Sequence, residues 1–179
     1  LSFMSIGTFH GGAGRAPRRM TLQTLDRMLR RHADERGDKT ALRDATAALS
    51  YRELEQRARR VAQGLRREGV EPGDRIAYLG KNTLAYFEFF LGAAKAGAVT
   101  VPINWRLAAP EVADLVGNAR PRVLLAEDPF LATATSAAPG MTPLVTGGPA
   151  DTFAAWRDRQ SEADLAPVSD WNQPVLQMY

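Results

Sequence analysis

The chain has 179 residues, of which 45% are hydrophobic and 24% charged, a balance typical of one globular domain or part of a larger one. Its 23 basic and 20 acidic residues, for a net charge of +3, are interspersed rather than segregated, which disfavours a nucleic-acid-binding surface. The lack of cysteine excludes disulfides and thiol catalysis within these residues and fits an intracellular, cytoplasmic protein. No run reaches the roughly 20 apolar positions of a membrane-spanning helix.

Residues 1–20 predict a flexible arm or upstream extension. They lack the apolar region of about 7 to 15 residues that a secretory signal peptide requires. The arm is basic, and this character continues into the next predicted helix. The arginines concerned are Arg15, Arg18, Arg19, Arg27, Arg30, Arg31 and Arg36. A solvated basic surface is the simpler interpretation, and peripheral contact with anionic lipid headgroups is the alternative.

The predicted folded portion, residues 21–179, begins with a helix. Thr24 is a suitable N-cap for a helix over residues 25–36, and Gly37 would end it. Residues 39–45 then favour a short strand. This segment therefore predicts a helix followed by extended chain.

A second helix has a clearer start signal. Ser50 is followed three residues later by Glu53, which matches a capping box. Leu49 before the cap and Leu54 within the first turns can pack against each other as a hydrophobic staple. The helix then carries one apolar stripe and ends at Gly69.

Strands and helices alternate over the rest of the chain. The expected strands are residues 75–79, 98–103, 122–128, 143–147 and 175–179. The expected helices lie within residues 83–97, 110–119, 129–138 and 152–159. The first of these has Asn82 as its expected N-cap and is apolar nearly all round, so it should be buried. The last strand follows a polar connector and reads as buried. The alternation predicts an α/β fold with a doubly wound, mostly parallel sheet flanked by helices.

Two features that imitate catalytic motifs are better explained structurally. The stretch from Gly73 to Asn82 resembles a phosphate-binding P-loop, but its glycine spacing is wrong, and the strand lies between Gly73 and Gly80 rather than before them. His10 lies in the arm, and His32 lies on an apolar helix face, where a packed histidine is the simpler reading. No histidine–carboxylate arrangement has metal-ligand spacing, so no metal site is predicted.

The stretch VPINWRL, residues 101–107, is the most informative part of the interior. A buried strand ends there, and Asn104, Trp105 and Arg106 follow in the next loop. In doubly wound sheets, ligands bind beyond the carboxyl ends of the strands. Arg106 is therefore a candidate for binding a phosphate group. Pairing with a local acid such as Glu111 is the competing explanation.

The order and spacing of four motifs carry a family resemblance. They are LSYRELE, GVEPGDRIA, LGAAKAGAVTVPIN and RLAAPEV. Together they resemble the N-terminal region of adenylate-forming (AMP-binding) enzymes, which include acyl- and aryl-CoA synthetases. The resemblance covers about residues 22–179, and VPINWRLAAPEV is most similar to bacterial fatty-acyl- and aryl-CoA ligases. It implies a ligase that uses ATP, Mg²⁺ and CoA to activate a carboxylic acid.

The resemblance also implies where the chemistry lies. In this family a strand similar to VLQMY leads into a Ser/Thr/Gly-rich loop that binds the phosphates of ATP. That loop would begin directly after Tyr179, so the chain looks like the N-terminal portion of a larger adenylation domain. No catalytic residue and no ATP-binding residue is assigned within it, and the segment alone is not expected to be active. Arg106, with its neighbour Trp105, becomes a candidate for contact with a CoA phosphate; relatives often carry a smaller residue or proline at the position of Trp105.

Two other functions remain open at this point. An adenylating enzyme could transfer the acyl group to the phosphopantetheine of a carrier protein instead of CoA. Alternatively, the chain could be a non-catalytic fragment or binding module. An apolar strand left exposed at its end argues against the second of these, because exposed apolar edges promote aggregation.

Overall fold

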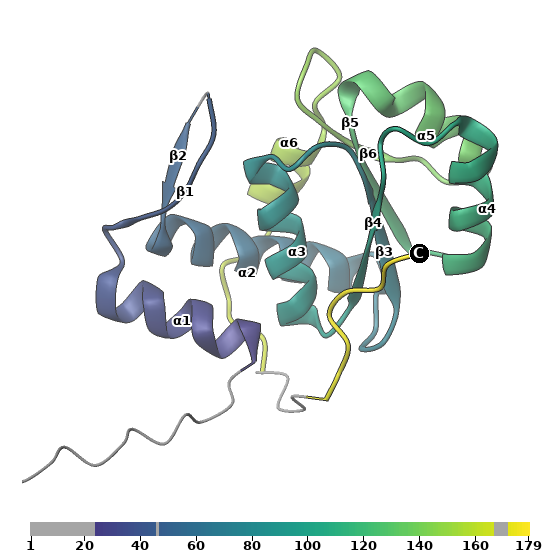
Figure 1. Cartoon of the computed structure of the whole chain (residues 1–179). Helices are drawn as coiled ribbons and strands as arrows, with labels where there is room; N and C mark the ends of the chain where they lie inside the picture. The colour runs from purple at the N-terminus through teal and green to yellow at the C-terminus, as the bar shows by residue number, and fades with distance from the viewer. Residues whose placement is uncertain (1–23, 46, 167–171) are drawn as a thin grey trace, which may run out of the picture.

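The computed structural model describes residues 24–45, 47–166 and 172–179, so the predicted arm at residues 1–20 lies outside the described part. The centre of the fold is a four-stranded parallel sheet with strand order β4-β3-β5-β6 (Figure 1). The strands are β3 (Arg75–Leu79), β4 (Val99–Ile103), β5 (Val123–Glu127) and β6 (Leu144–Thr146). The predicted α/β fold with a doubly wound parallel sheet is confirmed.

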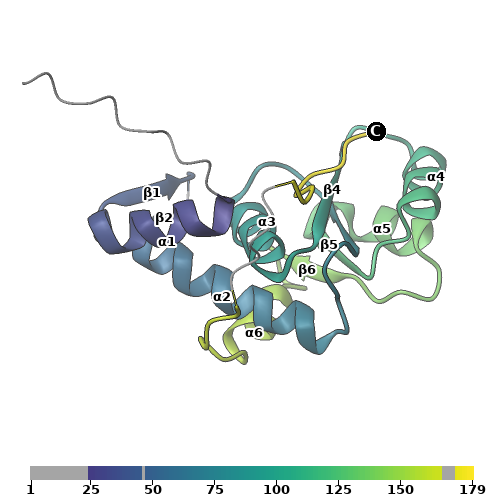
Figure 2. The ribbon, with the colours of Figure 1, turned by 90° about the horizontal axis from the view of Figure 1, so that it is seen from below.

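Helices cover both faces of the sheet, as Figures 1 and 2 show. One face packs against α2 (Tyr51–Arg67), α3 (Leu84–Ala96) and α6 (Phe153–Asp158). The other packs against α4 (Ala109–Ala119) and α5 (Leu131–Ala137), which follows the 3₁₀ turn η1 (Asp128–Phe130). The connection through α3 therefore runs over one face of the sheet, and the connections through α4 and α5 run over the other.

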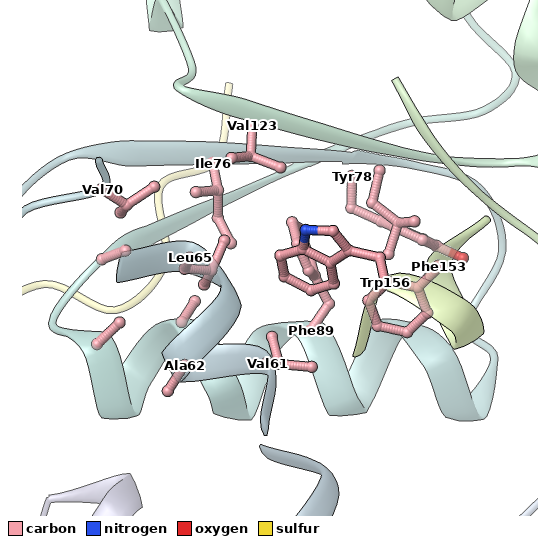
Figure 3. Packing of buried hydrophobic residues seen from close by; sticks show 14 residues of the cluster. Val61, Ala62, Leu65, Val70, Ile76, Tyr78, Phe89, Val123, Phe153 and Trp156 are labelled. Atoms are coloured by element: carbon pink, nitrogen blue, oxygen red, sulfur yellow. The ribbon is translucent and has the colours of Figure 1, made fainter. Parts of the chain in front are cut away.

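Alternate residues of β3 and of β5 belong to two separate cores. In β3, Ile76 and Tyr78 pack in the core under α2, α3 and α6, whereas Ala77 and Leu79 pack in the core under α4 and α5. Figure 3 shows the first core, in which Phe89 of α3 lies close to the side chains of the sheet. Because both faces are buried, the strands read as continuous apolar runs rather than as alternating ones.

The helix starts follow from local hydrogen bonds. The predicted capping box is confirmed, since Ser50 Oγ accepts from the Glu53 N–H at 3.2 Å and Glu53 Oε2 accepts from the Ser50 N–H at 2.8 Å. The prediction of Asn82 as the cap of α3 is wrong. Thr83 is the cap, because its backbone is extended and its hydroxyl accepts from the N–H of Tyr86 at 3.3 Å.

A small unit lies apart from the main sheet. It consists of α1 (Leu25–Arg36) and an antiparallel pair, β1 (Thr40–Arg43) and β2 (Ala48–Ser50). Its core joins it to the N-terminal half of α2 and contains Leu29, Leu49, Leu54 and Ala58. The leucines of the predicted staple both lie in this core. The strand β2 was not predicted, because only one of its three residues is buried and it leads directly into a helix cap.

The C-terminal segment adds to the sheet at the outer edge of β4. Leu176 forms a parallel bridge with Thr100, which donates to and accepts from the segment's backbone at 3.0 and 2.9 Å. The expectation of a buried strand is wrong, however. The segment forms one bridge only, and Leu176, Met178 and Tyr179 are 39%, 75% and 58% exposed because nothing described here packs over them.

Within the described ranges, none of the helices combines the length and the apolar character needed to cross a membrane.

Candidate functional site at the carboxyl edge of the sheet

The strand order creates a switch point at the carboxyl edge of β3 and β5. These strands are neighbours, but the chain leaves β3 through α3 toward β4, and leaves β5 through α5 toward β6. The two connecting helices lie on opposite faces, since α3 contributes to one core and α5 to the other. Such divergence opens a crevice that binds ligands in doubly wound folds. The first residues beyond β3 and the last of β5 therefore border the candidate site.

Both backbone groups of Lys81 are fixed at this switch point. Its N–H donates to Glu127 Oε2 at 2.8 Å, which joins the end of β3 to the end of β5. Its carbonyl accepts from the hydroxyl of Tyr78 at 2.7 Å. The hydroxyl oxygen of Tyr78 also lies 3.3 Å from Thr83 Oγ1. Burial raises the pKa of Tyr78 to about 12, so the phenol remains a donor at neutral pH. The Lys81 peptide is thus held while its side chain remains exposed.

Gly80 allows this close approach. A Cβ at Gly80 would lie 2.7 Å from the hydroxyl of Tyr78 and 2.9 Å from Cβ of Glu127, well inside contact distance. A larger residue would push the loop away from Glu127. Close packing therefore explains the glycine at position 80, which the sequence analysis compared with a glycine of a P-loop.

The loop after β4 presents Trp105 and Arg106 at the same edge. Asn104 organises it, since its side-chain oxygen accepts from the Arg106 N–H at 3.1 Å and its carbonyl from the Leu107 N–H at 3.1 Å. Trp105 packs against Phe130 with their ring centroids 5.8 Å apart. The guanidinium Cζ of Arg106 lies 4.2 Å from the centroid of the Trp105 ring, a cation–π contact that orients the charge.

The structure bears on one explanation that the sequence left open for Arg106, its pairing with a local acid. Glu111 does not pair with it, because Glu111 Oε2 accepts from the N–H of Ala108 at 2.8 Å and so caps α4. Among the described residues, Arg106 forms no ion pair with a carboxylate. The guanidinium is therefore exposed, stacked and without a local counter-charge.

Lys81 is the residue of this edge that sequence reasoning missed. Its Nζ lies 5.2 Å from the centroid of Trp105, so two cations from different loops share one indole ring. The only signal in the sequence was its place just after a strand, within a stretch set aside as a false P-loop. The proximity to Trp105 depends on the parallel pairing of β3 with β4.

Two pockets lie near the ends of the sheet. One, of about 380 Å³, adjoins the carboxyl edge and is bordered by Thr83, Glu127, Thr146 and Gly147. Carboxylates outnumber cations in its lining, so it is poorly suited to phosphate. The other, of about 640 Å³, lies between α4 and α5 at the opposite edge, where Arg75 begins β3. Its place at the amino ends of the strands separates it from the switch point.

The other residues considered in the sequence analysis are not part of the candidate site. His32 is half-buried, with its ring 5.2 Å from that of Tyr51, as expected of a packed histidine. Arg27 and Arg31 are exposed on α1, but Arg30 is turned inward and pairs with Asp26 at 2.8 Å. The arginines of the predicted arm lie outside the described residues.

In the part of the chain that the structure describes, no group of three or more histidine, aspartate or glutamate side chains could hold a metal ion. None of these residues is therefore assigned to Mg²⁺.

Comparison with protein families gives one match that covers most of the chain. A family model described as AMP-binding enzyme matches residues 29–179. The matched part contains the whole sheet and both loops of the candidate site.

Individual relatives agree with this match. A fatty acid–[acyl-carrier-protein] ligase of Streptomyces coeruleorubidus is 37% identical over 161 residues, which are 88% of this chain and 30% of the relative. A feruloyl-CoA synthase of Amycolatopsis is 42% identical over 112 residues, 63% of this chain and 23% of the relative. The chain thus spans less than a third of the length of these proteins.

Solved structures show the same fold. A benzoate CoA ligase of Burkholderia xenovorans LB400 superposes with a TM-score of 0.74 at 32% identity, covering 83% of this chain and 30% of the other. A fatty acyl CoA synthetase of Mycobacterium tuberculosis gives a TM-score of 0.76 at 28% identity, with coverages of 87% and 32%. Most of this chain therefore shares its fold with part of each of these structures.

Proposed function

Because the chain belongs to the family of AMP-binding enzymes, we propose that it is the N-terminal portion of an AMP-forming acid–thiol ligase. The whole protein would activate a fatty or aromatic carboxylic acid with ATP and transfer the acyl group to CoA. Ligases for both kinds of acid occur among its relatives and structural neighbours, which supports this substrate class.

The observation that carries the proposal is the place of Arg106. It lies at the carboxyl edge of the sheet, next to the switch point, where the fold positions ligands. It is stacked on Trp105 and free of a local acid, so its charge is available to a phosphate group. CoA carries such groups on its nucleotide, and the acceptor is the substrate that these residues would meet.

The proposed reaction has two steps. The carboxylate attacks the α-phosphorus of ATP, giving an acyl-adenylate and releasing pyrophosphate. The thiolate of CoA then attacks the acyl carbon, the bond to AMP breaks, and acyl-CoA forms. The described residues of this chain would orient the acceptor, not carry out either bond change.

The ATP site is proposed to begin beyond Tyr179. The bridge between Leu176 and Thr100 is parallel, so the chain runs at its end toward the carboxyl edge that holds Arg106. A loop continuing from Tyr179 would enter that same edge. Mg²⁺ is proposed to arrive with the nucleotide and not to be held by the described residues.

Formation of AMP by the whole protein tests the proposal. With ATP, CoA and a panel of fatty and aromatic acids, we expect AMP and pyrophosphate to form only when acid is present, and acyl-CoA only when CoA is added. A protein that forms no AMP with any acid of the panel would refute the activity.

A carrier protein as acceptor is the second candidate. It is favoured by the relative that covers 88% of the chain, a fatty acid–[acyl-carrier-protein] ligase. Incubation with both acceptors, followed by mass analysis of the acyl product, separates the two. Acyl-CoA alone supports the first proposal, and acylated carrier protein alone supports the second.

The place of action is proposed to be the cytoplasm, where ATP and CoA are available. The exposed Arg27 and Arg31 support a further proposal, peripheral contact with anionic lipids. Co-sedimentation with vesicles containing anionic lipid, at low and high salt, tests it. Binding that does not weaken with salt would contradict an electrostatic contact.

A further inference from the structure

We propose that Lys81, Trp105 and Arg106 form a two-cation clamp for the nucleotide of CoA, and that this clamp selects CoA over carrier-bound pantetheine. The inference rests on the proposed function. It adds a binding residue, Lys81, and assigns Trp105 a role in acceptor choice.

The clamp is built from two loops that the parallel sheet brings together. Lys81 follows β3, and Trp105 and Arg106 follow β4, its direct neighbour. Nζ of Lys81 and Cζ of Arg106 lie 5.2 and 4.2 Å from the centroid of the same indole. A smaller residue or proline at position 105 would offer neither cation an aromatic surface. Trp105 is therefore the residue that brings the two positive charges together into one site.

The clamp has an excess of positive charge. Two cations on one ring repel each other, and within the described ranges neither pairs with a carboxylate. Glu127, an acid of this edge, already accepts from the backbone N–H of Lys81. An anion placed between the two cations would relieve the repulsion, and charge-assisted hydrogen bonds would hold it.

The clamp is also organised before any ligand arrives. Tyr78 and Glu127 hold the peptide of Lys81 by hydrogen bonds, and the ring of Trp105 packs against that of Phe130. Stacking restrains the guanidinium of Arg106. Because less conformational freedom remains to be lost, a given set of phosphate contacts yields more affinity.

The ligand class follows from these features. Two cations around a partly buried aromatic ring at the edge of the sheet fit a molecule with more than one phosphate group and a flat base. CoA has a 3′-phosphate, a 5′-diphosphate and adenine, whereas carrier-bound pantetheine has a single phosphodiester and no base. Removal of one cation should therefore weaken the use of CoA and leave the use of a carrier protein almost unchanged.

The experiment measures acyl transfer by the whole protein and compares Lys81→Gln, Lys81→Arg and the wild type. CoA, 3′-dephospho-CoA and pantetheine serve as acceptors, and acid-dependent pyrophosphate exchange reports adenylation separately. Lys39→Gln is the matched control, since Lys39 is also exposed but lies on the turn before β1, away from the clamp.

The clamp predicts that Lys81→Gln raises KM for CoA about tenfold, as expected for loss of a charged phosphate contact, with kcat nearly unchanged. Lys81→Arg should restore most of the loss. The penalty should shrink with pantetheine, and KM for CoA should depend less on salt in Lys81→Gln than in the wild type.

Each negative outcome points to a separate failure. If the wild type forms no adenylate, the proposed function fails. If it forms acyl-CoA but Lys81→Gln behaves as Lys39→Gln, the proposed function stands and the clamp is wrong. An equal penalty with CoA and pantetheine would also overturn the clamp, because it would show a general effect on the thiol site.

Discussion

The ammonium of Lys95 lies 2.5 Å from Oδ1 of Asp26, and both side chains are almost fully withdrawn from solvent. The same ammonium lies 2.9 Å from Oε1 of Glu55. These residues come from α3, α1 and α2, so one buried cation ties three helices together. Arg30 and Arg59 complete the group at 2.8 and 2.9 Å from Asp26 and Glu55.

Replacement of the central cation should weaken this helix packing. Lys95→Met fills a similar volume but leaves Asp26 and Glu55 buried without their shared partner. Breaking a buried ion pair in this way costs about 3–5 kcal/mol. Hydrogen exchange of α1 and α3 amides would report the loss locally. Lys39→Met, at an exposed lysine, is the control, and equal protection in the two variants would contradict a stabilising role for the cluster.

The cluster also predicts a dependence on pH. Burial alone would raise the pKa of Asp26, but hydrogen bonds from Arg30 and Lys95 outweigh it and hold the pKa below its ordinary value of 3.8. The contribution of Asp26 to stability is therefore complete above that value and is lost as pH falls through the lower pKa of the folded state.

Denaturation midpoints measured from about pH 6 down to about pH 3 would test this. The wild type should lose stability toward the acid end of the series. Asp26→Asn should be less stable near neutral pH and should show a shallower decline, since it has no carboxylate to protonate at this position. Parallel curves for the two proteins would show that Asp26 does not contribute to the acid transition.

The elements of the fold could largely be predicted because their signals are local. The capping box of Ser50 and Glu53 involves residues three positions apart, and the buried strands are short apolar runs between turns. The wrong cap, Asn82 instead of Thr83, reflects two adjacent residues with similar capping ability. The weak strand β2 forms only by pairing with β1, which local propensity does not reveal.

The candidate site could be predicted only in part. Trp105 and Arg106 were found because they follow directly from a buried strand. The significance of Lys81 depends on contacts with Trp105 and Glu127, which come from other strands. Lys95 was hidden for the same reason, because its two carboxylate partners lie on other helices.

Arg106→Ala should separate the two nucleotide substrates that we propose for the whole protein. Because the loop after β4 presents the guanidinium at the proposed CoA site, we expect KM for CoA to rise about tenfold, and KM for ATP to change much less. Steady-state kinetics with each substrate varied in turn would measure both. Arg67→Ala, at the exposed end of α2, is a suitable control. Equal increases for ATP and CoA would remove the assignment of Arg106 to CoA.

Tyr78→Phe should loosen the loop that carries Lys81. It removes the hydroxyl that donates to the Lys81 carbonyl at 2.7 Å and keeps the ring in the core, so about 1 kcal/mol of stability should be lost. KM for CoA should rise with little change in adenylation. An unchanged KM, despite the loss of stability, would show that the hydroxyl serves folding alone.

The same hydroxyl should titrate late. Burial raises its pKa from 10.0 to about 12, so its contribution to stability is complete below pH 10.0 and is lost as pH rises toward 12. In an alkaline titration followed by tyrosinate absorbance, one tyrosine should ionise later than the others. This late step should be absent from Tyr78→Phe. Unaltered high-pH absorbance in that variant would contradict the assignment.

Two glycines in helices should respond oppositely to alanine. At Gly92 of α3, a Cβ would lie 2.5 Å from Cβ of Val61 and 3.0 Å from the carbonyl oxygen of Ala58, both on α2. The helices would have to separate, and overpacking of this kind costs about 1–3 kcal/mol. At Gly117 of α4, a Cβ meets no atom within 4 Å, so alanine should stabilise by up to about 1 kcal/mol through helix propensity.

Urea denaturation of both variants measures the difference. If Gly92→Ala were as stable as Gly117→Ala, the close contact of α2 with α3 would not be a constraint on the fold. If Gly92→Ala is destabilised and Gly117→Ala is not, the absence of a side chain at Gly92 is what allows the close contact of α3 with α2.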